Sequence, residues 1–445
     1  MVTGSTALRP LKRPPVSLSR IAKELSLTVA GLDVEVSGVA IGSRAVVPGD
    51  LFVALRGQHR HGSEFWDEAS ANGARAVLTD PEGAKHLGGD GVPMLVTEDP
   101  RALLGAVAAL VYGTVSGPLP TLFSVTGTNG KTSTAFLIEA LLRGLGRTTA
   151  LSTTALRLVN GVEFPSTLTT PEAPDTHAMI ARAAEEGVSG IALEVSAQAL
   201  DKNRMDQIVS DVSGFTNLSH DHFEDFGSME NYLLAKAPLF TQQLSRRAVL
   251  CVDSEWGARL DSMVTIPHVT LAREGGPASS WTYRIVEEDD DSTLFQVASA
   301  TGVSFQLRAP LRGGHMVANA SLAAVMLIQT GVDPQDLEHH MGPESQGIPV
   351  FIPGRMEKVS AAGGPRVFVD AGRSADAYEN TLKALRARTQ GQLIMVCGTS
   401  GNRDATKRPI MGRTAAELAD VVIVTDDDPR KEDPGVIRQG LLEGA

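Results

Sequence analysis

The stretch TGTNGKTST, residues 126–134, lies between an apolar run at 122–126 and a helical spacing of apolar residues over 133–145. A loop that ends a buried strand and opens a helix points its backbone N–H groups at one spot beside the positive helix terminus. Lys131 can then reach phosphate oxygens, and a hydroxyl of Thr132 or Ser133 can ligate Mg²⁺. We predict phosphate binding by Gly127, Thr128, Asn129, Gly130, Lys131, Thr132 and Ser133; the alternative is an empty glycine-rich turn.

The composition restricts the class of protein. The chain has 445 residues, 42% of them apolar and only 4% aromatic, so we expect aliphatic cores in about two to four domains. The formal net charge of −12 argues against a nucleic-acid binder or a membrane-surface protein. Cys251 and Cys397 give no disulfide framework, and no signal or membrane-spanning segment is evident. We therefore expect a cytoplasmic protein.

Three parts follow one another along the chain. Residues 1–17 resemble a loose arm, after which strand-like runs (51–55, 76–79, 94–96) alternate with helical spacing (103–112) up to a linker at 116–120. The loop then begins a second series with strands at 190–195 and 212–216, an antiparallel hairpin over 279–307 and a helix at 319–329. After a boundary at 347–355, strands (367–371, 393–397, 421–425) and helices (377–389, 414–418) form a smaller unit. This alternation predicts an α/β fold with a parallel sheet.

Several long motifs extend the pattern beyond the loop. They are SRAVVPGDLFVALRG (43–57), LTTPEAPD (168–175), LEVSAQALDKNR (193–204), FTNLSHDHFEDFGSMENYLLAKAPLF (215–240), PGRMEKV (353–359), ENTLKALR (379–386), GTSGNRDATKRPIMG (398–412) and DDDPRKEDP (426–434). Together with GTNGKTS, in this order, they make the chain similar to the Mur ligases, from about residue 39 to its end.

The resemblance implies an architecture and an activity. It implies a substrate-binding domain at 1–118, a central P-loop ATPase domain with a parallel sheet at 119–350, and a C-terminal Rossmann-like domain at 351–445, which we expect to be shortened. The activity would be ATP- and Mg²⁺-dependent formation of an amide bond, through an acyl phosphate, between UDP-N-acetylmuramoyl-L-alanyl-D-glutamate and a free diamino acid in peptidoglycan synthesis. We expect a monomer.

The resemblance also assigns roles to single residues. Catalysis would involve Lys131, Glu194, His222 and Lys236, and Mg²⁺ would be held by Thr132, Glu194, His222 and a carbamylated Lys236. ATP would also meet Asn319, Arg355 and Asp370, and the UDP-muramyl dipeptide would meet Ser43, Arg44, Thr169, Thr170, Ser196 and Arg204. Strand ends carry ligand groups in α/β sheets, which independently favours Glu194. Taken singly, Glu194 is also compatible with a solvated carboxylate, His222 with a surface histidine, Lys236 with an ordinary helix lysine, and Ser43 or Thr169 with a turn.

The motif at 427–430 bears on the incoming amino acid, together with Arg403. In relatives, Asp-Asn-Pro-Arg accompanies meso-diaminopimelate and Asp-Asp-Pro accompanies lysine, whereas this chain has Asp427-Asp428-Pro429-Arg430. Asp428 favours an incoming amino acid with a cationic side-chain amine, whereas Arg430 favours one with a second carboxylate. Because an unpaired buried charge costs several kcal/mol, these two residues should discriminate between the amino acids. We favour L-lysine, with meso-diaminopimelate as the alternative and ornithine still open.

Two other functions remain open. The family's Asp-Tyr-Ala-His-Thr-Pro-Asp is Asp-Ala-Gly-Arg-Ser-Ala-Asp at 370–376, at the ATP-side contact of the last two domains. One alternative is therefore a diverged, weakly active or non-catalytic paralogue that still binds the UDP-muramyl peptide. The other is a ligase for a different carboxylate, as in the folate-polyglutamate relatives.

Overall fold

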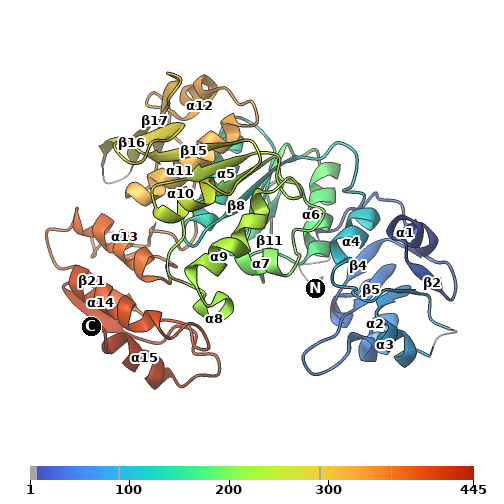
Figure 1. Ribbon diagram of the computed structural model, residues 1–445. Helices are drawn as coiled ribbons and strands as arrows, with labels where there is room; N and C mark the ends of the chain where they lie inside the picture. The colour runs from blue at the N-terminus through green and yellow to red at the C-terminus, as the bar shows by residue number, and fades with distance from the viewer. Residues whose placement is uncertain (1–7, 89–90, 290–291, 362) are drawn as a thin grey trace. The chain divides into compact units, whose positions relative to one another are not determined.

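The computed structural model describes residues 8–88, 91–289, 292–361 and 363–445. They form two compact units (Figure 1). Unit 1 comprises residues up to 122, 147–210 and 242–244, and unit 2 comprises 123–146, 211–241 and 245–445. Each unit is therefore built from segments that are distant in sequence.

The first part of unit 1 is a five-stranded sheet in the order β2-β7-β6-β5-β4. Its strands β4 (Gly38–Ala40), β5 (Asp50–Ala54), β6 (Ala76–Thr79) and β7 (Met94–Val96) are parallel, and β2 (Thr28–Ala30) is antiparallel to β7. Buried aliphatic residues such as Leu51, Val53 and Leu78 fill its core. The helices are α1 (Leu18–Leu25), α2 (Trp66–Ala71), α3 (Pro81–His86) and α4 (Leu104–Tyr112), and β1 (Val16–Ser17) pairs with β3 (Glu35–Val36). The predicted strands and helix of this part are confirmed.

The N-terminal arm corrects one expectation. Residues 1–7 lie outside the described residues, but from residue 8 onward the arm is not loose. Leu8 is buried, and the Arg9 guanidinium forms an ion pair with the buried carboxylate of Asp50. The backbone N–H groups of Leu11 and Lys12 donate to the Glu185 carboxylate over 2.7 and 2.9 Å. These long-range contacts were invisible in a local pattern of prolines and basic residues.

The second part of unit 1 carries strands in the order β11-β10-β9-β12. Strands β9 (Thr149–Ser152) and β12 (Gly190–Glu194) are parallel, whereas β10 (Arg157–Val159) is antiparallel to β9 and to β11 (Val162–Phe164). Helix α6 (Ala173–Glu185) packs on α4 (Figure 1), and the short α7 (Ala197–Asp201) follows β12. The loop after β12 therefore lies at the carboxyl end of a parallel strand.

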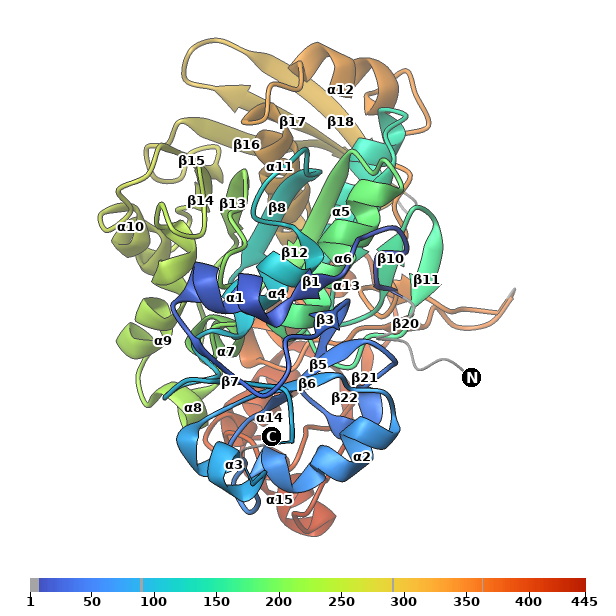
Figure 2. The ribbon, with the colours of Figure 1, turned by 90° about the vertical axis from the view of Figure 1, so that its right-hand side faces the viewer.

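Unit 2 holds strands in the order β8-β13-β14-β15-β16-β17-β18. Their bounds are β8 (Thr121–Thr126), β13 (Val212–Phe215), β14 (Ala248–Cys251), β15 (His268–Arg273), β16 (Trp281–Glu288), β17 (Thr293–Ser299) and β18 (Ser304–Ala309). The ladder is parallel from β8 to β16 and antiparallel from β16 to β18. The predicted hairpin is thus a three-stranded extension of the parallel sheet, with α12 (Pro334–Met341) packed on β18 (Figure 2).

Two long helices position the loop of interest in unit 2. Helix α5 (Lys131–Gly144) packs against α11 (Gly314–Ile328), and α11 also contacts β13 and β14 (Figure 1). Both helices are buried over most of their length; α11 is apolar on most of its surface, whereas α5 also buries Thr132, Ser133, Thr134 and Glu139. Shorter helices follow the strands: α8 (Phe223–Phe226), α9 (Met229–Lys236) and α10 (Glu255–Asp261).

The C-terminal part of unit 2 is built around a parallel pair, β21 (Ile394–Cys397) and β22 (Val421–Val424), with α13 (Ala375–Arg386), α14 (Lys407–Leu418) and α15 (Pro434–Leu442). The strand predicted at 367–371 is shorter, β20 (Phe368–Val369), and pairs antiparallel with β19 (Glu357–Lys358). Helix α14 begins seven residues before the predicted helix and includes Pro409. The helix tolerates this proline because it falls in the first turn, where a backbone N–H would have no partner within the helix.

Among the described residues, no helix has both the length and the apolar character that a membrane crossing requires. Cys251 and Cys397 are both free and buried.

Candidate functional site

The glycine loop joins β8 to α5, as predicted, and its two glycines have a steric reason. Gly127 has φ 149° and Gly130 has φ 85°. A Cβ at 127 would lie 1.9 Å from the Thr216 hydroxyl oxygen, and a Cβ at 130 would lie 2.4 Å from Asn319 Oδ1. Side chains at these positions would both strain the backbone and collide with buried neighbours. Asn319 therefore lies against the loop.

Lys131 opens α5 and folds back over the loop. Its Nζ donates to the carbonyl oxygens of Gly127 and Thr128 over 3.1 and 2.8 Å. Thr132 and Ser133 are buried in the first turn of the helix. The Arg355 Nη2 lies 3.4 Å from the Thr132 hydroxyl oxygen, so a second cation from a distant segment reaches the same helix terminus. The helix terminus, Lys131 and Arg355 together favour an anion here.

The loop is also held by the turn after β13, through Asn217 and Ser219, two residues that the sequence reasoning did not single out. The N–H groups of Thr128 and Asn129 donate to the backbone and side-chain oxygens of Asn217 over 2.9 and 3.0 Å. The Ser219 N–H donates to the Thr128 hydroxyl over 3.0 Å, and Asn129 Nδ2 donates to the Ser219 hydroxyl over 3.2 Å. The phosphate loop and the SHDH motif therefore form one hydrogen-bonded structure.

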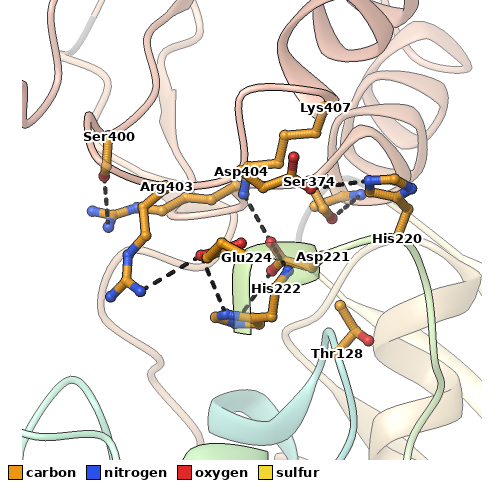
Figure 3. Close-up of polar contacts among 12 residues, drawn as sticks. Thr128, His220, Asp221, His222, Glu224, Ser374, Ser400, Arg403, Asp404 and Lys407 are labelled. Carbon is orange, nitrogen blue, oxygen red and sulfur yellow. Dashed lines mark hydrogen bonds and ion pairs between the residues drawn. The ribbon is translucent and has the colours of Figure 1, made fainter. Parts of the chain in front are cut away.

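His222 stands at the end of this turn with carboxylates around it (Figure 3). Its Nδ1 lies 3.9 Å from Glu224 Oε1 and 3.6 Å from Asp225 Oδ2, and its Nε2 lies 3.6 Å from Asp221 Oδ2. Ligand atoms of His222, Glu224 and Asp225 lie within 4.8 Å of one another, close enough to share a cation, although exposed acids commonly gather without one. Burial lowers the pKa of His222, which favours the neutral imidazole that metals bind.

His222 also has a strained backbone. Its φ and ψ are 57° and 31°, the left-handed region, which costs a non-glycine residue roughly 1–3 kcal/mol. Such a conformation persists only where neighbouring contacts hold it, and the Asp221 carboxylate accepts the His222 backbone N–H over 3.1 Å. The turn is therefore fixed by its own acidic residue.

Lys236, at the end of α9, is buried, as an ordinary helix lysine is not. Its side chain is 1% exposed, and its Nζ donates to the Gly127 carbonyl oxygen over 3.0 Å and lies 4.2 Å from the centre of the Tyr232 ring. Burial, reinforced by the positive charge of Lys131, holds the pKa of Lys236 well below its usual value. The lowered pKa favours the neutral amine, the form in which a lysine can act as a nucleophile.

The C-terminal part reaches the phosphate loop through the altered segment 370–376. Asn129 Nδ2 lies 3.1 Å from the Ser374 hydroxyl oxygen and 2.7 Å from Asp376 Oδ2. Asp370 accepts the N–H groups of Met356 and Gly372 over 2.9 and 2.8 Å. Asp370 thus braces the chain just after Arg355, and Ser374 and the unchanged Asp376 contact the loop.

The loops that follow β21 and β22 carry the residues expected at the amino-acid site. Asp427 Oδ2 lies 3.5 Å from the Ser400 hydroxyl oxygen and 3.8 Å from Arg373 Nη2. Asp428 pairs with Arg430 over 3.3 Å, and Arg430 has a left-handed φ of 52°. Arg403 pairs with Glu224 over 3.6 Å (Figure 3), so the structure brings it to the His222 cluster.

All six residues expected to meet the muramyl peptide belong to unit 1, and four of them lie close together near Glu194. Glu194 ends β12, is 3% exposed, and accepts the N–H and hydroxyl of Thr154 over 2.9 and 3.1 Å. The Thr170 hydroxyl donates to the Glu194 backbone oxygen over 2.9 Å and accepts the Ser196 N–H over 3.0 Å. The hydroxyl oxygens of Thr154 and Thr169 lie 3.0 Å apart, which makes Thr154 a member of this group that the sequence reasoning missed.

Arg204 joins this group, while two other residues lie elsewhere in unit 1. The guanidinium of Arg204 is 2.9 Å from Glu172 Oε1 and 3.2 Å from the Thr170 carbonyl oxygen. Ser43 lines a cavity of about 640 Å³ whose walls carry three arginines and three carboxylates that the sequence reasoning did not select as site residues: Arg56, Arg60, Arg101, Asp80, Glu98 and Asp99. The side chain of Arg44 is 92% exposed beside Glu68.

Comparison with known proteins agrees with this arrangement. The Mur ligase family catalytic domain matches residues 35–112, the Mur ligase middle domain residues 125–327, and the Mur ligase glutamate ligase domain residues 354–445. A UDP-N-acetylmuramyl-tripeptide synthetase from Leifsonia xyli is 46% identical over 442 residues, which are 99% of this chain and 86% of that protein. A UDP-N-acetylmuramoyl-L-alanyl-D-glutamate--2,6-diaminopimelate ligase from Streptomyces coelicolor is 40% identical over 98% of this chain and 85% of its own length. The chain belongs to the Mur ligase family.

Solved structures show the same fold. A structure of a UDP-N-acetylmuramoyl-L-alanyl-D-glutamate--2,6-diaminopimelate ligase superposes with a TM-score of 0.67 at 27% identity, covering 97% of this chain and 86% of that one. MurF from Acinetobacter baumannii gives a TM-score of 0.72 at 19% identity, covering 98% and 89% of the two chains, which supports the fold alone. The predicted α/β Mur ligase fold with a parallel-rich sheet is thereby confirmed. As a Mur ligase, the chain is an ATP-dependent ligase of peptidoglycan synthesis.

Proposed function

We propose that this Mur ligase adds a diamino acid to UDP-N-acetylmuramoyl-L-alanyl-D-glutamate through an acyl phosphate. The observation that carries the proposal is the phosphate loop, where Lys131 and Arg355 from separate segments meet the start of α5. The names of the two relatives above support the substrate. The three matched ranges support a division into three domains at 1–118, 119–350 and 351–445.

The first chemical step joins two anions. A carboxylate oxygen of the muramyl peptide attacks the γ-phosphorus of ATP, the bond to the ADP oxygen breaks, and an acyl phosphate forms. Such an attack needs cations that neutralise charge before and during transfer, and Lys131 and Arg355 supply two. In the second step the amine of the amino acid attacks the acyl carbon, loses a proton and displaces phosphate.

Mg²⁺ fits the residues that unit 2 offers. Thr132 supplies a hydroxyl, His222 a neutral imidazole, and a carbamate on Lys236 would supply oxygens. Carbamylation joins the neutral lysine amine to CO₂ with loss of a proton, and the lowered pKa of Lys236 favours that neutral form. Glu194, which the resemblance also assigns to the metal, is a buried carboxylate of unit 1. Bound Mg²⁺ would supply charge neutralisation for the triphosphate.

The UDP-muramyl dipeptide would be held by residues of unit 1. The cavity beside Ser43 has three arginines in its wall together with Asp80, Glu98 and Asp99, and each arginine is paired with a glutamate, so a diphosphate would have to displace those carboxylates to be bound there. The group of Thr169, Thr170, Ser196 and Arg204 offers hydroxyls and a guanidinium to sugar and carboxylate oxygens. Ser196 also caps α7, so part of its role is structural.

L-lysine is the amino acid that we propose. Asp427 and Asp428 place two carboxylates at the carboxyl ends of β21 and β22, the edge where parallel sheets bind ligands. The Arg430 guanidinium and the Asp428 carboxylate are paired with each other, so a substrate amine at Asp428 or a second substrate carboxylate at Arg430 would each have to displace one member of that pair. Meso-diaminopimelate is the second candidate, because the Streptomyces coelicolor relative is named for it.

An ADP-release assay decides among these substrates. Purified protein is incubated with ATP, Mg²⁺ and the UDP-muramyl dipeptide, together with L-lysine, ornithine or meso-diaminopimelate. We expect ADP release to depend on the dipeptide and to be fastest with lysine. Release with meso-diaminopimelate alone would move the proposal to the second candidate, and no release with any amine would overturn it.

A further inference from the structure

One turn of unit 2, residues 217–222, is bonded on two sides. Towards α5, Asn217 and Ser219 hold Thr128 and Asn129 of the phosphate loop. Towards α14, the next residues meet side chains from the GNRDATK motif, more than 180 positions later in the chain (Figure 3). His222, the residue proposed for Mg²⁺, follows directly.

The strongest of these contacts is a largely buried ion pair. Lys407 is the first residue of α14, its side chain is 8% exposed, and its Nζ lies 2.8 Å from Asp221 Oδ1. The same oxygen accepts the backbone N–H of His222 over 3.1 Å. Lys407 therefore fixes the carboxylate that holds His222 in its left-handed conformation. Burying a lysine at the end of a helix is costly unless its charge is paired, so the contact is specific.

A second contact runs beside the first. His220 Nε2 lies 3.0 Å from Asp404 Oδ2, and the His220 ring stacks on Phe223 with centroids 4.0 Å apart. The other oxygen of Asp404 accepts the Thr406 N–H over 2.8 Å, which ties this carboxylate to the start of α14. The two contacts, at the neighbouring residues His220 and Asp221, leave the turn little freedom relative to α14.

We infer that Lys407 is a positioning residue for His222: through Asp221 it makes the geometry at the proposed Mg²⁺ site depend on engagement of the start of α14. Lys407 would then contribute to the first reaction step without touching ATP itself. The inference rests on the proposed role of His222 at the metal. The rival explanation is that the pair only stabilises the fold.

The experiment compares Lys407→Met with Lys407→Arg and with Lys383→Met. Lys383, on α13, is an exposed lysine in an i,i+4 pair with Glu379, so its replacement controls for loss of a charge. The first readout is the ring resonance of His222 in full-length protein labelled on histidine, assigned by its loss in His222→Gln. We expect Lys407→Met to shift it, Lys407→Arg to restore it in part, and Lys383→Met to leave it unchanged.

The second readout is the Mg²⁺ concentration for half-maximal ADP release, with the KM for the UDP-muramyl dipeptide measured in parallel. We expect Lys407→Met to raise the first about tenfold and leave the second unchanged, since contacting side chains couple by amounts of this order. Asp221→Asn should do the same, and the double variant should be no worse than either single one.

The possible outcomes distinguish failure of the proposed function from failure of the positioning role of Lys407. If wild-type protein releases no ADP, the proposed function fails, whatever the resonance does. If the wild type is active but Lys407→Met leaves both the His222 resonance and the Mg²⁺ dependence unchanged, the positioning role is wrong while the proposed function stands. Equal losses in Lys407→Met and Lys383→Met, or additive effects of Lys407→Met and Asp221→Asn, would also overturn the positioning role.

Discussion

Replacing Gly130 by alanine tests how closely the phosphate loop is fitted. Two costs follow from the structure. The left-handed φ of 85° penalises a Cβ by roughly 1–2 kcal/mol. The Cβ would also lie 2.4 Å from Asn319 Oδ1 and 3.0 Å from Asn319 Cγ, and overpacking of this kind costs about 1–3 kcal/mol. Since Asn319 is only 6% exposed, it has little room to move, and the loop N–H groups must shift instead.

Gly146, just after α5, gives a matched control. Its φ of 71° carries the same backbone penalty, but a Cβ there would meet nothing within 4 Å. We expect Gly146→Ala to lower the unfolding temperature slightly and leave ATP affinity unchanged. Gly130→Ala should lower the unfolding temperature further and weaken ATP binding at least tenfold, about 1.4 kcal/mol. Calorimetric titration with ATP and thermal unfolding measure both quantities. Wild-type ATP affinity in Gly130→Ala would refute the fit derived for the loop.

Three further predictions concern other residues. In Asp428→Asn we expect kcat/KM for L-lysine to fall about tenfold relative to that for meso-diaminopimelate, because the carboxylate facing the side-chain amine is lost; an unchanged ratio would exclude Asp428 from substrate choice. His177 is fully buried, and burial lowers its pKa from 6.5 to about 4, so the unfolded state binds a proton at a higher pH than the folded state does. The free energy of unfolding should therefore fall, by up to roughly 3 kcal/mol, as the pH drops from about 6.5 to about 4. In His177→Gln the free energy of unfolding, measured by denaturation across this pH range, should depend less on pH. Lys236→Met should abolish ligation and remove the carbamate signal that ¹³C-bicarbonate gives with the wild-type protein; a carbamate signal that persists in the variant would assign it to another amine.

The local pattern of apolar residues was sufficient to predict the strand and the helix around the phosphate loop. The apolar run before Gly127 and the helical spacing after Lys131 are strong because a buried strand and a buried helix leave little choice of residue. The same holds for β6 and β7, whose predicted and observed bounds agree. Where an element is short or carries a proline, as at β20 and the start of α14, periodicity failed.

The contacts between distant segments could not be predicted in this way. Arg403 could be selected from its motif. The roles of Asp404 and Lys407 could not be predicted, because they depend on contacts with His220 and Asp221, more than 180 positions away. Likewise, Arg9 resembles part of a basic arm until its pairing with buried Asp50 is known. Ion pairs of this kind depend on tertiary packing, because only packing determines which buried charges have an oppositely charged partner.

The most direct measurement is single-turnover formation of the ligated UDP-muramyl tripeptide and ADP from ATP, Mg²⁺, the UDP-muramyl dipeptide and L-lysine, in wild type and in Lys131→Ala. We expect wild-type protein to form both products in equal amounts. Loss of the Lys131 cation should slow the reaction by at least a hundredfold, in the range found when a preorganised charge-stabilising group is removed. Undiminished product formation in Lys131→Ala would contradict phosphate transfer at this loop.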